Sequence, residues 1–163
     1  QSDFLIELLD EIGKEGLHRA VDTTGMTKTE TLLEVAKRTD LFLYDLKAMN
    51  PEVHKKFTGV SNKKILENLK ILAQSGANIN VRIPLIKGVN TDEKNIALSA
   101  EFIANLPGDI PVSLLPYHNI AQGKHERLGQ EYDQEGLKEP LEEELERVIQ
   151  QFAEFGVRAT VGG

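Results

Sequence analysis

Reactive side chains recur where apolar stretches of the chain end, and they offer several kinds of chemistry. They are Asp22, Thr23, Asp45, Lys47, Arg82 and His118. Together they supply carboxylates, a hydroxyl, an ammonium, a guanidinium and an imidazole. Mixed charges suit a small polar ligand that carries both signs, such as an amino acid or a nucleotide bearing one. The carboxylates could also hold a cation, because hard ions prefer oxygen ligands.

Asp45 and Lys47 are central to this pattern, because they directly follow the apolar residues Leu41–Tyr44. Such an apolar run is typical of a strand that is covered on both faces in a parallel sheet. On this strand, predicted over residues 40–47, side chains two apart point the same way, so the carboxylate and the ammonium share a side. Parallel folds bind ligands at the carboxyl ends of their strands. A helix cap followed by a solvated lysine explains Asp-x-Lys alone equally well, and the other strand ends favour a site.

Strands and helices are predicted to alternate along the chain. The strands cover residues 17–21, 40–47, 79–86, 110–115 and finally 157–161. Helical periodicity is found before Gly16, over residues 28–38, from Ser61 to Gly76, over residues 92–105 and from Pro140 to Gly156. Asn50 and Pro51 predict a short helical turn. Thr27 and Glu30 predict a capping box. Residues 119–139 are expected to form a surface loop.

This alternation predicts an α/β fold, a single domain over residues 1–163 with parallel strands and right-handed crossovers. Four βα units are too few to close a barrel, because eight strands make the usual one. The expected architecture is therefore a partial (β/α) barrel. Within it, Pro84 predicts a bend or a sheet edge, because proline has no N–H to donate to a neighbouring strand.

Composition excludes several classes of function. The net charge of −7 argues against a nucleic-acid-binding protein, which would show a basic face. No long apolar run and no signal-peptide pattern is present, so we expect a cytoplasmic protein without a membrane span. With no cysteine, the chain has no disulfide, thiolate nucleophile or cysteine-bound metal. No phosphate loop, Ser-His-Asp arrangement or zinc spacing is found. Because the chain starts at Gln1 without Met, we expect a piece of a longer protein.

Several motifs carry a resemblance to a known family. They are Asp22-Thr23-Thr24-Gly25, Asp45–Asn50, Thr58–Asn62, Arg82–Ile86, Leu115–His118, and Gly123-Lys124-His125 with Leu128-Gly129. In order and spacing they resemble the glycyl-radical-enzyme activating enzymes of the radical S-adenosylmethionine superfamily, among them the activator of pyruvate formate-lyase. The resemblance covers nearly the whole chain. Thr24 and Lys87 depart from it, because asparagine and proline are common there in the family.

The resemblance implies a fold, a reaction and partners. The family fold is a partial barrel of six βα units that holds a [4Fe-4S] cluster and S-adenosylmethionine. Reductive cleavage of S-adenosylmethionine gives a 5′-deoxyadenosyl radical, which removes a hydrogen atom from a glycine of a partner enzyme such as pyruvate formate-lyase. Flavodoxin or ferredoxin is the expected electron donor.

By matched motif, the resemblance also implies roles for the site residues. Lys47 and Arg82 would contact S-adenosylmethionine, and His118 would lie along its adenosine part. Asp22, Thr23, Asp45 and the backbone carbonyl of Leu43 would form a monovalent-cation site beside it. An ammonium suits the ligand's carboxylate, and carboxylates suit a cation.

Two family motifs are missing from the sequence. Cys-x-x-x-Cys-x-x-Cys, which holds the cluster, and Gly-Gly-Glu, which holds the methionine amine, are both absent. The chain therefore resembles the last four of the six units, and alone we expect it to bind no iron–sulfur cluster and to be inactive. We also expect it to self-associate through the edge of its first strand and the apolar side of its first helix, around Phe4 and Leu8.

Two other functions remain open at this stage. An aldolase-like barrel enzyme could use Lys47 as a Schiff-base nucleophile in a dry pocket. Against this, Asp45 on the same side would keep the ammonium charged, and no phosphate-binding glycine loop follows the last strand. A non-enzymatic binding module, whose polar mouth docks a protein, is the other alternative.

Overall fold

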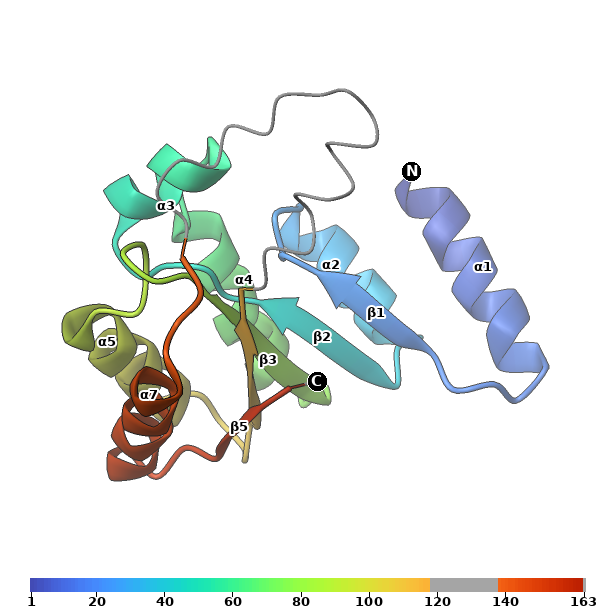
Figure 1. Ribbon diagram of the computed structural model, residues 1–163. Coiled ribbons are helices and arrows are strands. Elements are labelled where there is room, and N and C mark those ends of the chain that lie inside the picture. The colour runs from blue at the N-terminus through green and yellow to red at the C-terminus, as the bar shows by residue number, and fades with distance from the viewer. Residues whose placement is uncertain (118–137, 163) are drawn as a thin grey trace, which may run out of the picture.

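A computed structural model describes residues 1–117 and 138–162 (Figure 1). A parallel five-stranded sheet has the order β1-β2-β3-β4-β5, so each strand lies beside its neighbour in sequence. The strands are β1 Ala20–Thr23, β2 Leu41–Asp45, β3 Ile79–Leu85, β4 Val112–Pro116 and β5 Ala159–Val161. The helices are α1 Ser2–Lys14, α2 Thr29–Ala36, α3 Pro51–Thr58, α4 Lys63–Gln74, α5 Glu93–Ala104 and α7 Glu142–Glu154. The predicted α/β fold with parallel βα units, an open arc of a barrel, is confirmed.

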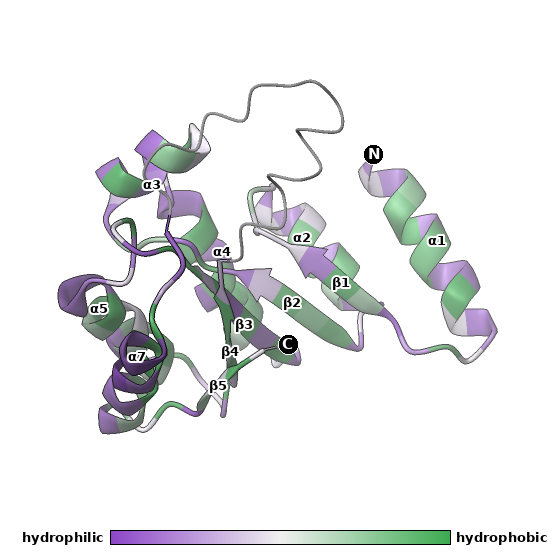
Figure 2. Cartoon of the chain, viewed as in Figure 1, coloured by the Kyte–Doolittle hydropathy of each residue, from purple (hydrophilic) through white to green (hydrophobic). Residues whose placement is uncertain are grey.

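Alternation along the strands separates the two faces of the sheet. The helix-facing side chains are almost fully buried and form the centre of the core: Phe42, Tyr44, Val81, Ile83, Leu85, Val112 and Leu114. The side chains between them, such as Leu43, Asp45 and Arg82, are only half-buried. Figure 2 shows that β1 and β2 are hydrophobic where they begin and turn hydrophilic at their carboxyl ends. The burial of alternate apolar residues therefore leaves the charged ones on the uncovered face.

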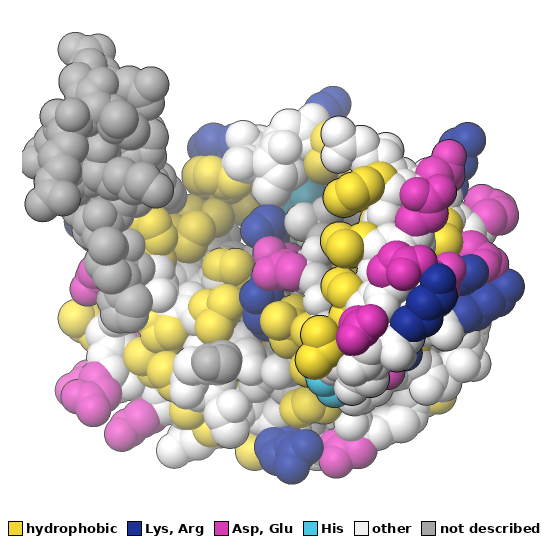
Figure 3. All heavy atoms as spheres, turned by 90° about the vertical axis from the view of Figure 1, so that its right-hand side faces the viewer, with side chains coloured by type: hydrophobic (Ala, Val, Ile, Leu, Met, Phe, Trp, Pro, Cys, Tyr) yellow, Lys and Arg dark blue, Asp and Glu magenta, His cyan; other side chains and the backbone are white. Residues whose placement is uncertain are grey.

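Helix α1 lies beside β1 and packs on α2 (Figure 1). Two apolar side chains of α1 remain exposed, Phe4 at 65% and Leu8 at 42%. Figure 3 shows a row of apolar side chains on the face of the molecule to which α1 belongs. No described helix is both long and apolar enough to cross a bilayer.

The observed N-terminal ends of the helices differ in several details from the predicted ones. Asn50 does cap α3, accepting from the N–H groups of Glu52 and Val53, but α3 is an eight-residue helix rather than a short turn. The predicted capping box of Thr27 is wrong. Helix α2 starts after Lys28 without a side-chain cap, because Thr27 belongs to a loop in which its N–H donates to the carbonyl of Gly25.

Helix α4 also starts one residue later than Ser61 indicated. Its N-cap residue is Asn62, whose side-chain amide donates to the carbonyl oxygens of Ala48 and Met49 instead of capping the helix. The tertiary bonds of this amide therefore take precedence over a local cap.

Pro84 is not at a sheet edge, because β3 is the central strand. The N–H of Val81 donates towards β4, to the carbonyl of Pro111, so alternation turns the nitrogen of Pro84 towards β2. Strand β2 has already ended there, since its last pair with β3 is Asp45 with Arg82. The missing N–H of Pro84 therefore costs the sheet no hydrogen bond between strands.

Strand β1 begins three residues later than predicted, at Ala20, so Asp22 and Thr23 lie within it. The two preceding loops are joined by Arg19 and Asp40. The N–H and Nε of Arg19 donate to Asp40 Oδ2 at 2.8 and 3.0 Å, and Nη2 donates to Oδ1 at 3.1 Å. This pairing fixes where β1 and β2 start side by side.

We expect the Asp40 carboxylate to titrate with a midpoint near pH 2. The hydrogen bond from the Arg19 side chain, and then that from its backbone, lower the pKa of Asp40 from 3.8 to about 2. Because the folded pKa is below the unfolded one, the contribution to stability is full above about pH 4 and is lost as the pH falls through 2. NMR titration should show this midpoint, and Arg19→Ala should move it towards the ordinary aspartate value. Lys37→Ala, which breaks only the Lys37–Glu34 pair, is the control and should leave it unchanged.

Candidate functional site

Arg82 joins the carboxyl ends of three strands. Its Nη2 donates to Asp22 Oδ1 at 2.5 Å and to Asp45 Oδ1 at 2.7 Å, and its Nε donates to Asp45 Oδ1 at 3.0 Å. Burial lowers the pKa of the guanidinium, but the two carboxylates outweigh burial and raise it overall. Residues from β1, β2 and β3 that are far apart in sequence therefore form one cluster on the uncovered face of the sheet.

Lys47 completes this ion cluster of Asp22, Asp45, Arg82 and Lys47. Its Nζ lies 3.3 Å from Asp45 Oδ2. The side chain of Lys47 is 40% exposed, whereas those of Arg82 and Asp45 are 18% and 16% exposed. The two cations balance the two carboxylates, and of the two cations the ammonium is the more exposed and so the more open to a ligand. The cluster is thus suited to a small ligand with charges of both signs.

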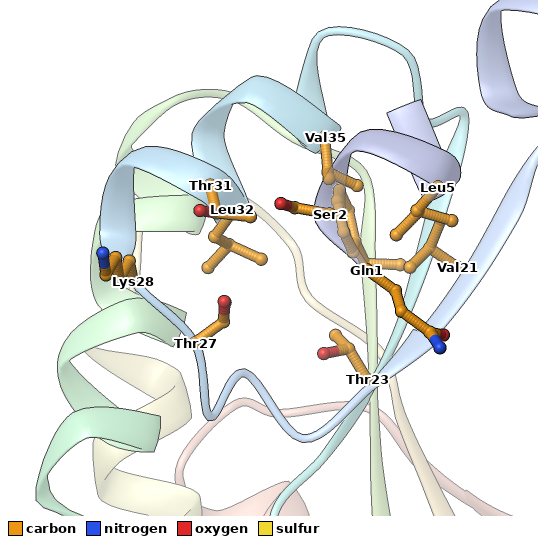
Figure 4. A pocket seen from close by; sticks show the side chains of 11 residues that line it. Gln1, Ser2, Leu5, Val21, Thr23, Thr27, Lys28, Thr31, Leu32 and Val35 are labelled. Carbon is orange, nitrogen blue, oxygen red and sulfur yellow. The ribbon is translucent and has the colours of Figure 1, made fainter. Parts of the chain in front are cut away.

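The structure does not bring Thr23 into the ion cluster. Side chains alternate along β1, so the Thr23 side chain lies on the helix-facing side, in a pocket of about 450 Å³ between α1, α2 and the sheet (Figure 4). Its Oγ1 accepts from the N–H of Gly25 at 2.9 Å. Leu43 lies on the same face as Asp22, its partner in the ladder between β1 and β2. In the part of the chain that the structure describes, no three His, Cys, Asp or Glu side chains gather as for a metal ion.

His118 and the motif residues Gly123-Lys124-His125 and Leu128-Gly129 lie outside the described residues. The predicted place of His118 beside the ligand therefore stays a prediction.

A close approach of Gly25 to Tyr44 fixes the turn after β1. Gly25 has φ +68°, and a Cβ there would lie 1.6 Å from the Tyr44 hydroxyl oxygen. That hydroxyl donates to the carbonyl of Ile65 at 2.7 Å, and burial raises the pKa of Tyr44. The turn that follows Asp22 is therefore packed directly on β2 and α4.

The sequence reasoning missed a set of buried asparagines that hold the loops around the site. They are Asn62, Asn68, Asn90 and Asn95. Asn68, for example, donates to the carbonyl oxygens of Gly25 and Thr27 at 2.7 and 2.9 Å. An asparagine that does not cap a helix is usually exposed, so nothing in the sequence indicated that these side chains would be buried. Asn62 is the exception, because it ends the Thr58–Asn62 motif.

A pocket of about 400 Å³ opens beside Lys47, at the carboxyl ends of β2 and β3. Its walls come from α3 and from the turn after β3, and its lining is mostly apolar, with Val53, Phe57, Ile86 and Val89. A ligand bound at Lys47 would therefore lie next to this apolar pocket.

Comparison with known proteins identifies the family. The model of the radical SAM superfamily matches residues 1–100. The chain is 44% identical over 162 residues to the trans-4-hydroxy-L-proline dehydratase activating enzyme of Clostridioides difficile, covering 99% of this chain and 54% of that protein. It is 34% identical to the pyruvate formate-lyase 1-activating enzyme of Escherichia coli K12, covering 96% and 64%. The chain thus spans about half to two thirds of these relatives.

Among solved structures, a domain of pyruvate-formate lyase-activating enzyme from Bacteroides vulgatus superposes with a TM-score of 0.87 at 42% identity. The match covers 99% of this chain and 91% of that one. The resemblance that the strand-end motifs indicated is confirmed. The chain belongs to the radical SAM superfamily.

Proposed function

We propose that this chain is the C-terminal part of a radical SAM activating enzyme that generates a glycyl radical on a partner enzyme such as pyruvate formate-lyase. The observation that carries the proposal is the ion cluster of Asp22, Asp45, Arg82 and Lys47 in a chain whose relatives are activating enzymes. Its strand-end position is where parallel folds bind ligands. A glycyl radical enzyme would be the partner, flavodoxin or ferredoxin the electron donor, and the cytoplasm the location.

The residues present fit S-adenosylmethionine. Its amino-acid end carries a carboxylate, and the partly exposed ammonium of Lys47 offers that carboxylate a charge-assisted hydrogen bond. As seen from the ligand, Arg82 would lie behind Lys47, held in place by its hydrogen bonds to the carboxylates of Asp22 and Asp45. We assign Lys47, Arg82, Asp22 and Asp45 to this end of the ligand, and His118 to its adenosine part.

A monovalent cation would have to share its ligands with Arg82. The carboxylates of Asp22 and Asp45 and the carbonyl of Leu43 are the candidate ligands, but Arg82 already bonds both carboxylates. Thr23 could join only after a rearrangement of β1, because its side chain lies on the other face. We therefore assign the cation a secondary role.

An iron–sulfur cluster would need ligands from outside this chain, since the chain has no cysteine. When bound, the cluster and S-adenosylmethionine would supply the radical chemistry. The residues of this chain would bind and orient the ligand and hold its carboxylate. A Schiff-base role is not favoured, because Lys47 is 40% exposed and lies 3.3 Å from Asp45, whereas a Schiff-base lysine needs a dry, apolar pocket.

The coding sequence upstream of the codon for Gln1 tests the proposal at little cost. We expect it to encode Cys-x-x-x-Cys-x-x-Cys and Gly-Gly-Glu in the same reading frame. An upstream sequence without cysteines would contradict the proposal and return the choice to the aldolase-like enzyme and the binding module.

We also propose that the isolated chain self-associates. Strand β1 is an edge of the sheet, and α1 beside it exposes Phe4 and Leu8. Unpaired strand edges and apolar rows are templates for association. Light scattering should show species larger than a monomer, and Phe4→Glu with Leu8→Lys should shift them towards the monomer. A monomer for the unaltered chain at high concentration would refute this.

A further inference from the structure

Asn90 lies in the turn between β3 and α5, and it is only 2% exposed. Its Nδ2 donates to the carbonyl oxygens of Lys47 at 2.6 Å and Pro84 at 2.7 Å. Its Oδ1 accepts from the N–H of Ile86 at 2.8 Å. These partners fix the orientation of the amide, because a carbonyl can only accept and a backbone N–H can only donate.

Asn95, in the first turn of α5, extends the network to Met49. Its Nδ2 donates to the backbone carbonyl of Asn90 at 2.8 Å, and its Oδ1 accepts from the N–H of Met49 at 2.8 Å. The segment 47–49 is thus hydrogen-bonded at one end to the turn after β3 and at the other to the first turn of α5.

The backbone of Lys47 lies beyond the end of the β-ladder. The last pair of β2 with β3 is Asp45 with Arg82, and the N–H of Leu46 donates to the carbonyl of Arg82 at 2.9 Å. From Lys47 onward, the loop depends on side chains for its bonds to β3. Asn90 supplies such a bond to the one lysine of the ion cluster.

We propose that Asn90 is a positioning residue for Lys47. It fixes the Lys47 backbone against the end of β3 and thereby fixes where the ammonium lies relative to Asp45 and Arg82. The identity of the ligand that Lys47 would bind rests on the proposed function. The coupling between Asn90 and Lys47 rests on the hydrogen bonds alone. A merely structural asparagine would instead stabilise the turn without acting through Lys47.

A double-mutant cycle in the full-length protein separates these roles. Asn90→Ala should weaken S-adenosylmethionine binding, measured by calorimetry, about tenfold. In the Lys47→Ala background the same change should cost almost nothing further, because residues that act through one another are not additive. Ile79→Val, at the opposite end of β3 and 2% exposed, is the control: it should lower the melting temperature and leave the affinity unchanged. Equal losses with and without Lys47 would overturn the proposal.

Hydrogen–deuterium exchange of the ligand-free 163-residue chain tests whether Asn90 holds the backbone around Lys47 in place. Asn90→Ala should speed exchange in residues 46–50 about tenfold and leave residues 17–23 unchanged, while Ile79→Val should not act on residues 46–50. Unchanged exchange in residues 46–50 would overturn the proposal. If the unaltered full-length protein binds no S-adenosylmethionine, the proposed function fails, and the exchange result alone decides the role of Asn90.

Discussion

Replacing Gly25 by alanine is expected to lower the free energy of unfolding by about 3 kcal/mol or more. Gly25 has φ +68°, where a side chain is strained, and its Cβ would lie 1.6 Å from the Tyr44 hydroxyl oxygen. Tyr44 cannot easily give way, because its ring is fully buried and its hydroxyl donates to the carbonyl of Ile65. Strain and overpacking therefore add at one position.

Gly16→Ala is the matched control for this effect. Gly16 has a similar φ of +70°, but nothing lies within 4 Å of a Cβ placed there. It should therefore show the backbone strain alone, about 1 kcal/mol. Urea unfolding of both variants measures the difference. If Gly25→Ala costs no more than Gly16→Ala, the turn after β1 is not packed on Tyr44 as described.

Lys47→Ala is expected to weaken the affinity of the full-length protein for S-adenosylmethionine by roughly ten- to more than a hundredfold. The estimate follows from about 1.5–3 kcal/mol for a hydrogen bond to a charged group. Lys47→Arg should recover part of the loss, because the charge is kept although the geometry changes. Lys70→Ala removes an exposed lysine from α4, away from the cluster, and should leave the affinity unchanged. Calorimetry measures all three variants.

Borohydride trapping with a carbonyl substrate distinguishes the remaining enzymatic alternative. A Schiff-base lysine would be labelled covalently, and arginine could not replace it. We expect no reduced adduct on Lys47 by mass spectrometry. An adduct there, or unchanged affinity in Lys47→Ala, would contradict the assignment of Lys47 to ligand binding.

The sequence was sufficient to predict the fold and the convergence of the charged strand ends. Apolar runs alternating with helical periodicity define βα units, and parallel strands place their carboxyl ends together, so Asp22, Asp45, Lys47 and Arg82 had to lie at one edge. The pairing of Arg82 with both carboxylates could not be predicted from the sequence, because it depends on the register between β2 and β3.

Other details depend on contacts between distant parts of the chain. Thr23 was expected beside Asp22, but β1 starts later than predicted, and alternation within it turns the two side chains to opposite faces. Asn68 and Asn90 bond carbonyls more than 40 residues away in sequence. Their local sequence therefore carries no sign of those bonds.

Electron paramagnetic resonance tests the central claim most directly. The full-length protein, reconstituted anaerobically with iron and sulfide and supplied with S-adenosylmethionine and a reductant, would be mixed with trans-4-hydroxy-L-proline dehydratase or pyruvate formate-lyase. We expect a glycyl radical signal on a partner that depends on S-adenosylmethionine and is weakened in Lys47→Ala. A protein that binds the cluster and S-adenosylmethionine yet produces no glycyl radical on either partner would contradict the claim that this chain belongs to an activating enzyme for a glycyl radical enzyme such as pyruvate formate-lyase.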